Sequence, residues 1–151
     1  LGARDSLRLE AGLCLYGNDI DNGTTPVAAA LEWAVQKVRR TGGARAGGFP
    51  GADIILPEFE RGTTRRRVGI APEGRAPIRG GADLFLDATS SAPVGRITSG
   101  GFGPTVDAPV AMGYVANSLS ETGTKLFAEL RGKRVPVTVA NLPFITPRYK
   151  R

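Results

Sequence analysis

Histidine is absent from the 151-residue chain, and cysteine, methionine and tryptophan occur once each. Without histidine, the chain cannot form a Ser-His-Asp or Cys-His catalytic set of its own. The single cysteine, Cys14, cannot make an intramolecular disulfide, which is typical of a reducing compartment. One cysteine without histidine also makes no zinc site, so we expect no metal. Cys14 lies between leucines, and we expect it to be a small buried hydrophobic residue.

Long apolar runs are also absent, because none approaches the roughly 20 residues that a membrane-spanning helix needs. We therefore expect no membrane partner. The first residues lack the basic and apolar regions of a signal peptide, and the chain does not begin with Met. We expect the N-terminus to be cut, so that the sequence holds one domain and a piece of another.

Basic residues outnumber acidic ones, and the net charge is +6. Such a balance can indicate nucleic acid, an acidic protein or a polyanionic cofactor. The only dense basic run, residues 65–67, leads directly into the apolar residues 68–70, and no strand-like run is rich in aromatic residues. We therefore expect no nucleic-acid partner, and a solvated basic face or an acidic partner instead.

The first third of the chain favours helix and turns. Ala3, Leu7 and Ala11 recur at helical spacing before Gly12, which predicts a helix over 3–11.

A polar, turn-rich segment follows at 16–25. Thr25 suits a helix N-cap and Pro26 the first helical position, which predicts a little over one helical turn at 27–31. The Gly-rich segment 41–51 predicts a surface loop that leads into a new unit.

Beyond Gly51 the sequence consists of short apolar runs separated by turns. Their regular spacing predicts an antiparallel sheet, sandwich or small barrel, and seven strands in about 100 residues favour a closed barrel without exposed edges. The seven runs are 52–57, 65–71, 82–87, 93–99, 108–115, 124–130 and 133–140.

The last two runs form the clearest unit, because apolar residues alternate in both and Arg131-Gly132-Lys133 can turn between them. The pattern predicts a hairpin with one apolar face. Pro136 cannot donate to a strand ladder, so we expect its strand to lie at an edge or to be bulged.

Few residues suggest chemistry by type and spacing alone. The Gly-rich segment 98–105 lacks the lysine of a phosphate-binding loop, so we predict a tight turn between strands. Glu10, Asp19 and Asp21 are candidate catalytic carboxylates. Because Asp19 and Asp21 share one turn, however, the pattern is more typical of aspartates that satisfy their own backbone.

Arg4 and Arg8 lie one helical turn apart and share a face, which is typical of a solvated surface whose repulsion Asp5 or Glu10 offsets. Alternatively, the two arginines hold a carboxylate.

Two aromatic residues also leave alternatives open. Trp33, the only tryptophan, suits either a core or a ligand wall, and its size favours the core. Tyr149, near the C-terminus, either folds back over a site or lies in a frayed tail.

Several blocks of the sequence together resemble the C-terminal part of the aminomethyltransferases, the T-proteins of the glycine cleavage system. The most specific block is ARDSLRLEAGLCLYGNDID, and its wording is more similar to the mitochondrial members than to the bacterial ones. The blocks occur in the family's order at 3–21, 24–35, 49–56, 65–70, 95–105, 110–115 and 142–149.

The resemblance implies a mainly β fold with a short helical N-terminal segment and a C-terminal antiparallel β-barrel domain. Residues 1–45 would be the tail of the folate-binding region, and residues 46–151 the barrel domain. The family moves the methylene of the aminomethyl group on the lipoylated H-protein to tetrahydrofolate and releases ammonia. The implied location is the mitochondrial matrix, or the cytoplasm for a bacterial protein.

The resemblance also assigns site residues. Arg4, Trp33 and Tyr149 match family positions at the folate site, with tetrahydrofolate as co-substrate and no metal. The family's catalytic aspartate lies upstream of Leu1, so no catalytic residue is expected in this chain, and we expect it to be inactive alone. The implied partners are the H-protein and the N-terminal half of the same protein. Two alternatives stay open: the tail domain of a folate-dependent demethylating dehydrogenase, or a non-catalytic folate-binding module.

Overall fold

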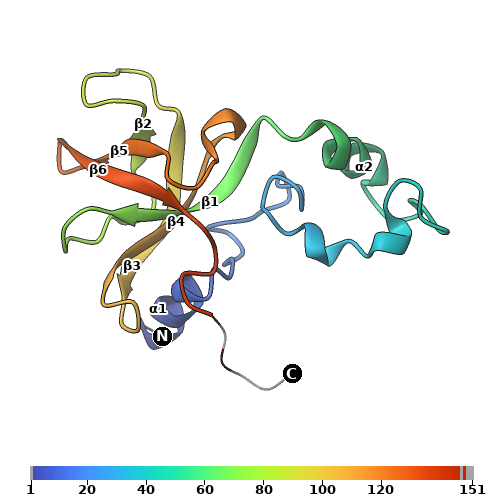
Figure 1. The fold of residues 1–151 in the computed structure, drawn as a ribbon, viewed down its shortest axis with the longest axis horizontal. Helices are drawn as coiled ribbons and strands as arrows, with labels where there is room; N and C mark the ends of the chain where they lie inside the picture. The colour runs from blue at the N-terminus through green and yellow to red at the C-terminus, as the bar shows by residue number, and fades with distance from the viewer. Residues whose placement is uncertain (1, 147, 149–151) are drawn as a thin grey trace.

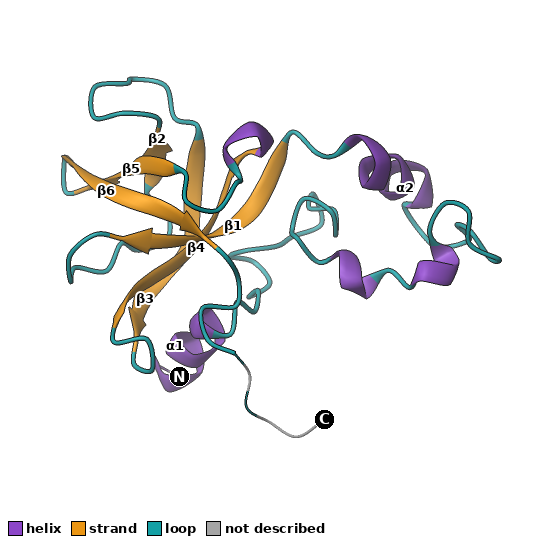
Figure 2. Ribbon diagram, in the orientation of Figure 1, coloured by secondary structure: helices purple, strands orange, loops and turns teal. Residues whose placement is uncertain are grey.

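The computed structural model describes residues 2–146 and 148, and it consists of a β-barrel with a helical arm at one side (Figure 1). Figure 2 shows that the strands gather in the barrel, whereas α2 and two short 3₁₀ helices lie in the arm. The helices are α1 (Gly2–Glu10), η1 (Glu32–Ala34), η2 (Lys37–Arg39), α2 (Ala52–Arg61) and η3 (Asn117–Leu119). No helix among the described residues has the length and apolar character that crossing a membrane requires.

Six antiparallel strands close the barrel in the order β1-β4-β3-β2-β5-β6. Closure pairs each strand on both sides and removes the edges that an open sheet would expose. The predicted mainly β fold and the closed barrel are therefore confirmed. The strands are β1 (Arg65–Pro72), β2 (Asp83–Phe85), β3 (Gly95–Gly103), β4 (Ala108–Ala116), β5 (Lys125–Leu130) and β6 (Lys133–Ala140).

The barrel interior is filled by aliphatic side chains. The predicted hairpin of β5 and β6 is confirmed, with its apolar face turned inward and a two-residue turn at Arg131-Gly132. The buried interior comprises Val68, Ile70, Ile78, Leu84, Ile97, Ala111, Val115, Leu126, Ala128, Val137 and Val139.

The helix α1 covers the outside of the barrel over β3 and β4, close to the predicted bounds. Its residue Leu9 is buried and packs on Val110 and Met112 of β4. Leu142 and Phe144, which follow β6, cover the same small cluster. The two ends of the described chain thus meet on one outer face of the barrel.

The segment 52–57, predicted to be a strand, is instead the start of α2. A short apolar run does not distinguish strand from helix by itself. Here the run continues into Glu58–Arg61, whose residues favour helix, and Ile55, Leu56 and Phe59 share a half-buried face.

The Gly-rich segment 98–105 was expected to be a turn, but β3 extends through it to Gly103, and the turn occupies 104–107. The reason is tertiary. A side chain on Gly100 would collide with the carbonyl oxygen of Ile78, so glycine lets another segment approach the strand.

The expectation that Pro136 marks an edge or bulge is also wrong. The strand β6 pairs with both β5 and β1, and Pro136 lies one residue beyond the last β1 pair, Pro72 with Val137. Its carbonyl still accepts a hydrogen bond from the Glu73 backbone N–H at 3.0 Å. The missing N–H of proline is therefore harmless at the end of this ladder.

We expect Gly100→Ala to destabilise the protein by about 1–3 kcal/mol, because overpacking forces the backbone of Ile78 to move. Urea unfolding would measure the loss. Gly2→Ala is the matched control, since a side chain there meets nothing within 4 Å. Equal stability of the two variants would contradict the steric argument.

Candidate functional site

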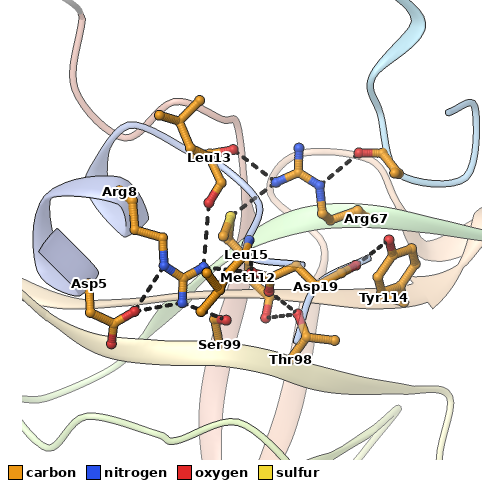
Figure 3. A network of polar contacts seen from close by, with 12 residues as sticks. Asp5, Arg8, Leu13, Leu15, Asp19, Arg67, Thr98, Ser99, Met112 and Tyr114 are labelled. Carbon is orange, nitrogen blue, oxygen red and sulfur yellow. Dashed lines mark hydrogen bonds and ion pairs between the residues drawn. The ribbon is translucent and has the colours of Figure 1, made fainter. Parts of the chain in front are cut away.

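A buried ion pair joins α1 to the loop that follows it, and both partners also form hydrogen bonds with β3 of the barrel (Figure 3). Arg8 Nη1 donates to Asp19 Oδ2 at 2.6 Å, and Arg8 Nη2 donates to Asp5 Oδ1 at 2.6 Å and to Ser99 Oγ at 2.9 Å. The Arg8 side chain is 11% exposed and that of Asp19 is fully buried. Charges removed from water are tolerated only when they are paired and hydrogen-bonded, and this pair meets that condition.

Both carboxylate oxygens of Asp19 are occupied by protein donors. Besides Arg8, they accept hydrogen bonds from the Leu15 N–H at 2.9 Å and from Thr98 Oγ at 2.5 Å. The Asp19 carbonyl accepts from the Tyr114 hydroxyl at 2.7 Å, and burial raises the pKa of that tyrosine to about 12. Asp19 therefore ties the loop to β3 and β4 and has no free oxygen for catalysis.

Asp21 behaves as the turn pattern predicted. Its carboxylate is exposed and accepts hydrogen bonds from Thr24 Oγ and from the Gly23 N–H, both at 2.9 Å. These bonds, first that from Thr24, lower the pKa of Asp21 below its ordinary value.

Glu10, the third candidate carboxylate, is fully buried at the end of α1. Its Oε1 accepts from the N–H groups of Thr105 at 2.5 Å and Val106 at 2.9 Å, which fixes the turn between β3 and β4. Its backbone carbonyl accepts from the N–H groups of Phe144 at 2.9 Å and Ile145 at 3.3 Å. Glu10 thus holds the turn and the segment after β6 against α1.

Arg67 of β1 is 4% exposed and bonds two separate segments. Its Nε donates to the Ala29 carbonyl at 2.7 Å, and its Nη1 donates to the Gly12 carbonyl at 3.0 Å and contacts Met112 Sδ at 3.0 Å. Sequence reasoning missed this role, because nothing in the basic run distinguishes Arg67 from its neighbours.

The other two arginines of that run also engage protein groups. Arg65 stacks on the ring of Tyr114, 4.6 Å from its centre. Arg66 Nη1 donates to Glu32 Oε1 at 2.6 Å and to the Val27 carbonyl at 3.1 Å. The three arginines 65–67 therefore anchor residues 27–32 and the end of the barrel.

Two clefts meet beside Arg67 and share Ala30, Arg67 and Leu142 in their walls. The larger has a volume of about 570 Å³ and mostly apolar walls, whereas the smaller, of about 260 Å³, is more polar. The walls of the larger are completed by Ala11, Gly12, Leu13, Cys14, Leu31, Trp33 and Pro143.

Trp33 lies in the wall of the larger cleft and is 75% exposed, so the expectation of a core tryptophan is wrong. The short helix η1 buries none of its residues, which leaves the indole uncovered. Cys14, expected to be buried, is only half-buried in the same wall, and burial raises the pKa of its thiol.

The predicted arginine pair separates. Arg8 is committed to Asp5 and Asp19, so it shares no carboxylate ligand with Arg4, and Asp5 offsets its charge as expected. Arg4 is exposed on α1, and within the described residues it makes no ion pair or side-chain hydrogen bond.

Tyr149 lies outside the described residues. In the described part of the chain, no group of three His, Cys, Asp or Glu residues is placed to hold a metal.

We expect Asp19→Asn to destabilise the protein by about 3 kcal/mol, because it leaves the buried guanidinium of Arg8 without its buried partner. Asp21→Asn is the matched control, since its side chain is exposed and an amide oxygen can keep the turn. Thermal or urea unfolding of both variants would test this, and equal losses would count against the ion pair as the anchor.

Two family profiles match the chain in two regions separated by residues 40–64. The glycine cleavage T-protein C-terminal barrel domain matches residues 65–145, more than half of the chain, and the GCVT N-terminal domain matches residues 1–39. The second match covers α1, the Asp19 loop and η1, whereas the first covers all six strands.

The mitochondrial aminomethyltransferase of Dictyostelium discoideum is 43% identical over 100% of this chain and 36% of that protein. That of Mus musculus is 47% identical over 99% of this chain and 35% of that protein. The chain thus spans about a third of the length of these relatives.

The crystal structure of the glycine cleavage system aminomethyltransferase T from Bartonella henselae is 52% identical and covers 99% of this chain and 40% of that one, with a TM-score of 0.88. Because the barrel profile matches more than half of the chain and the relatives and the solved structure agree with it, the chain belongs to the glycine cleavage T-protein family.

Proposed function

We propose that this chain is the C-terminal portion of an aminomethyltransferase, which transfers the methylene of the aminomethyl group on the lipoylated H-protein to tetrahydrofolate and releases ammonia. One observation carries the proposal: 99% of the chain matches the Bartonella aminomethyltransferase T at 52% identity. The mitochondrial names of the eukaryotic relatives favour the mitochondrial matrix, or the cytoplasm if the protein is bacterial.

Within that protein, Arg4 and Trp33 would form part of the folate site. Arg4 is exposed on α1, so its guanidinium can be reached by a ligand. Trp33 offers an uncovered indole at an apolar cleft. Flat aromatic rings pack on indole faces, and carboxylate or carbonyl oxygens suit a guanidinium, which fits the rings and acidic tail of folate.

Tyr149 is the third proposed folate residue, four positions after Ile145 in the sequence. The Ile145 N–H is hydrogen-bonded to the carbonyl of Glu10 at the end of α1, the helix that carries Arg4. This anchor supports a role for the C-terminal segment at the same site.

The catalytic group would come from the N-terminal part of the longer protein. The buried carboxylates in this chain serve its own structure, since Asp19 is saturated by donors and Glu10 holds a turn and the C-terminal segment. General acid–base help to methylene transfer needs a carboxylate at the reacting atoms. We therefore assign this chain to binding and positioning.

The N-terminal part would also cover the exposed apolar side chains of this chain. Four of its large exposed hydrophobic residues lie in the region that matches the N-terminal domain family. Exposed large apolar side chains can mark a surface that another domain covers. They are Leu7, Leu13, Tyr16 and Trp33.

The isolated chain is expected to show no methylene transfer when mixed with aminomethylated H-protein and tetrahydrofolate. The measurement is formation of methylenetetrahydrofolate, with a full-length relative as the positive control. Turnover by the isolated chain would contradict the assignment of catalysis to the N-terminal part.

In the full-length protein, Arg4→Ala is expected to weaken tetrahydrofolate binding by about 1–3 kcal/mol, the cost of losing a charged hydrogen bond. Calorimetric titration with tetrahydrofolate would give the dissociation constant. Arg45→Ala, at an exposed arginine of the Gly-rich loop, is the control. An unchanged constant for Arg4→Ala would refute the role of this residue.

A further inference from the structure

We propose that Arg67 is a positioning residue for the folate site: it sets the placement of the segment that carries Arg4 relative to the segment that carries Trp33. This inference rests on the proposed function, but the tether itself can be tested without folate. Arg67 lies in the wall of both clefts and is not among the residues proposed to bind folate.

The hydrogen bonds of Arg67 reach the two segments at the points where each begins or ends. Gly12 lies two residues after the end of α1, in the turn that follows the helix, and its carbonyl accepts from Arg67 Nη1. Ala29 lies three residues before η1, in the turn that leads to Trp33. One guanidinium thus bridges the turn after α1 and the entry to η1.

The backbone around the second acceptor needs an external support. Ala30, directly after Ala29, has a φ of 54°, in the left-handed region that residues with a side chain seldom adopt. Such conformations persist where the surroundings hold them in place. The hydrogen bonds from Arg67 Nε to Ala29 and from the Arg67 N–H to Ala28, at 2.7 Å each, supply that support.

The geometry leaves Arg67 little freedom to move. The side chain is almost fully buried, and a guanidinium presents its donors in a rigid planar fork. Its two acceptors therefore stay at a fixed separation as long as both bonds exist. Arg66 does not duplicate this function, since its side chain holds only Val27 and Glu32 of the second segment.

Two substitutions separate the bridge from the charge. Arg67→Met keeps an elongated side chain but has no donor, so both carbonyls lose their partner. Arg67→Lys keeps the charge, but a single ammonium lacks the planar fork that holds two acceptors at a fixed separation. We expect a graded effect, largest for Arg67→Met and intermediate for Arg67→Lys.

A control must lower stability without touching either segment. Ile97→Val meets this need, because Ile97 is fully buried inside the barrel and makes no contact with the Arg67 hydrogen bonds. Its effect on the melting temperature can be compared directly with that of the Arg67 variants.

The first measurement uses the chain by itself, in which Trp33 is the only tryptophan. Well below the melting temperature, Arg67→Met is expected to shorten the rotational correlation time of Trp33 in time-resolved fluorescence anisotropy, with a smaller change for Arg67→Lys. Ile97→Val should leave it unchanged. If Arg67→Met gives the anisotropy decay of the unchanged chain, the tether is refuted, whatever the activity shows.

The second measurement uses the full-length protein. Arg67→Met is expected to raise the KM for tetrahydrofolate at least tenfold, with a smaller rise for Arg67→Lys and none for Ile97→Val. A mobile Trp33 with an unchanged KM would overturn the positioning role. If Arg67→Met fails to fold, the anisotropy of Trp33 and the KM for tetrahydrofolate are compared between Arg67→Lys and Ile97→Val instead. Absence of transfer by the unsubstituted full-length protein would instead contradict the proposed function, and the anisotropy result would still decide the tether.

Discussion

The arrangement of the site depends on one requirement: charged side chains that leave water must find partners within the protein. Arg8 and Asp19 satisfy it by pairing with each other, and Arg67 satisfies it by bonding backbone carbonyls. The Arg67 bonds join the N-terminal segment to β1, and the Arg8–Asp19 pair is joined to β3 through Ser99 and Thr98. Leu9 adds an apolar contact with Val110 and Met112, so polar and apolar contacts together hold this segment on the barrel.

This division of roles explains why the barrel and the site differ in character. The interior of the barrel is aliphatic and closed. Such an interior could support many different functions, because a fold alone does not determine function. The region beside Arg67 of β1 instead carries charge, a half-buried thiol, an exposed indole and two clefts. The barrel is a rigid support, and the N-terminal segment packed against it carries the exposed polar and aromatic side chains.

Besides the closed barrel, which the regular spacing of short strands indicated, the features that sequence patterns predicted correctly are determined locally. The helix 3–11 and the last hairpin follow from periodicity and turn residues alone. Gly100 could not be interpreted in this way, because its small size matters only when Ile78 approaches it from elsewhere in the chain. Pro136 looked like an edge residue because pairing on both sides of β6 depends on closure of the whole sheet.

The site was predictable only in part, because it also depends on contacts between residues that are far apart in the sequence. Arg8 was grouped with Arg4, but a partner eleven residues away removes it from the surface, and the sequence does not show that partner. Trp33 was expected inside because of its size, whereas the short helix that carries it buries nothing. Arg67 was one of three adjacent arginines, and its position beneath Gly12 and Ala29 is a property of the fold.

The hydrogen bonds from Phe144 and Ile145 to the carbonyl of Glu10 join the segment after β6 to the end of α1. They close nearly the whole chain into a ring without a covalent bond, and the entropic cost of such closure grows only slowly with the length of the loop. In a ring, the first and last segments cannot detach independently, because releasing one uncovers the cluster of Leu9, Val110 and Met112 beneath the other. The two ends of the described chain therefore form one cooperative unit, although they are the parts farthest apart in the sequence.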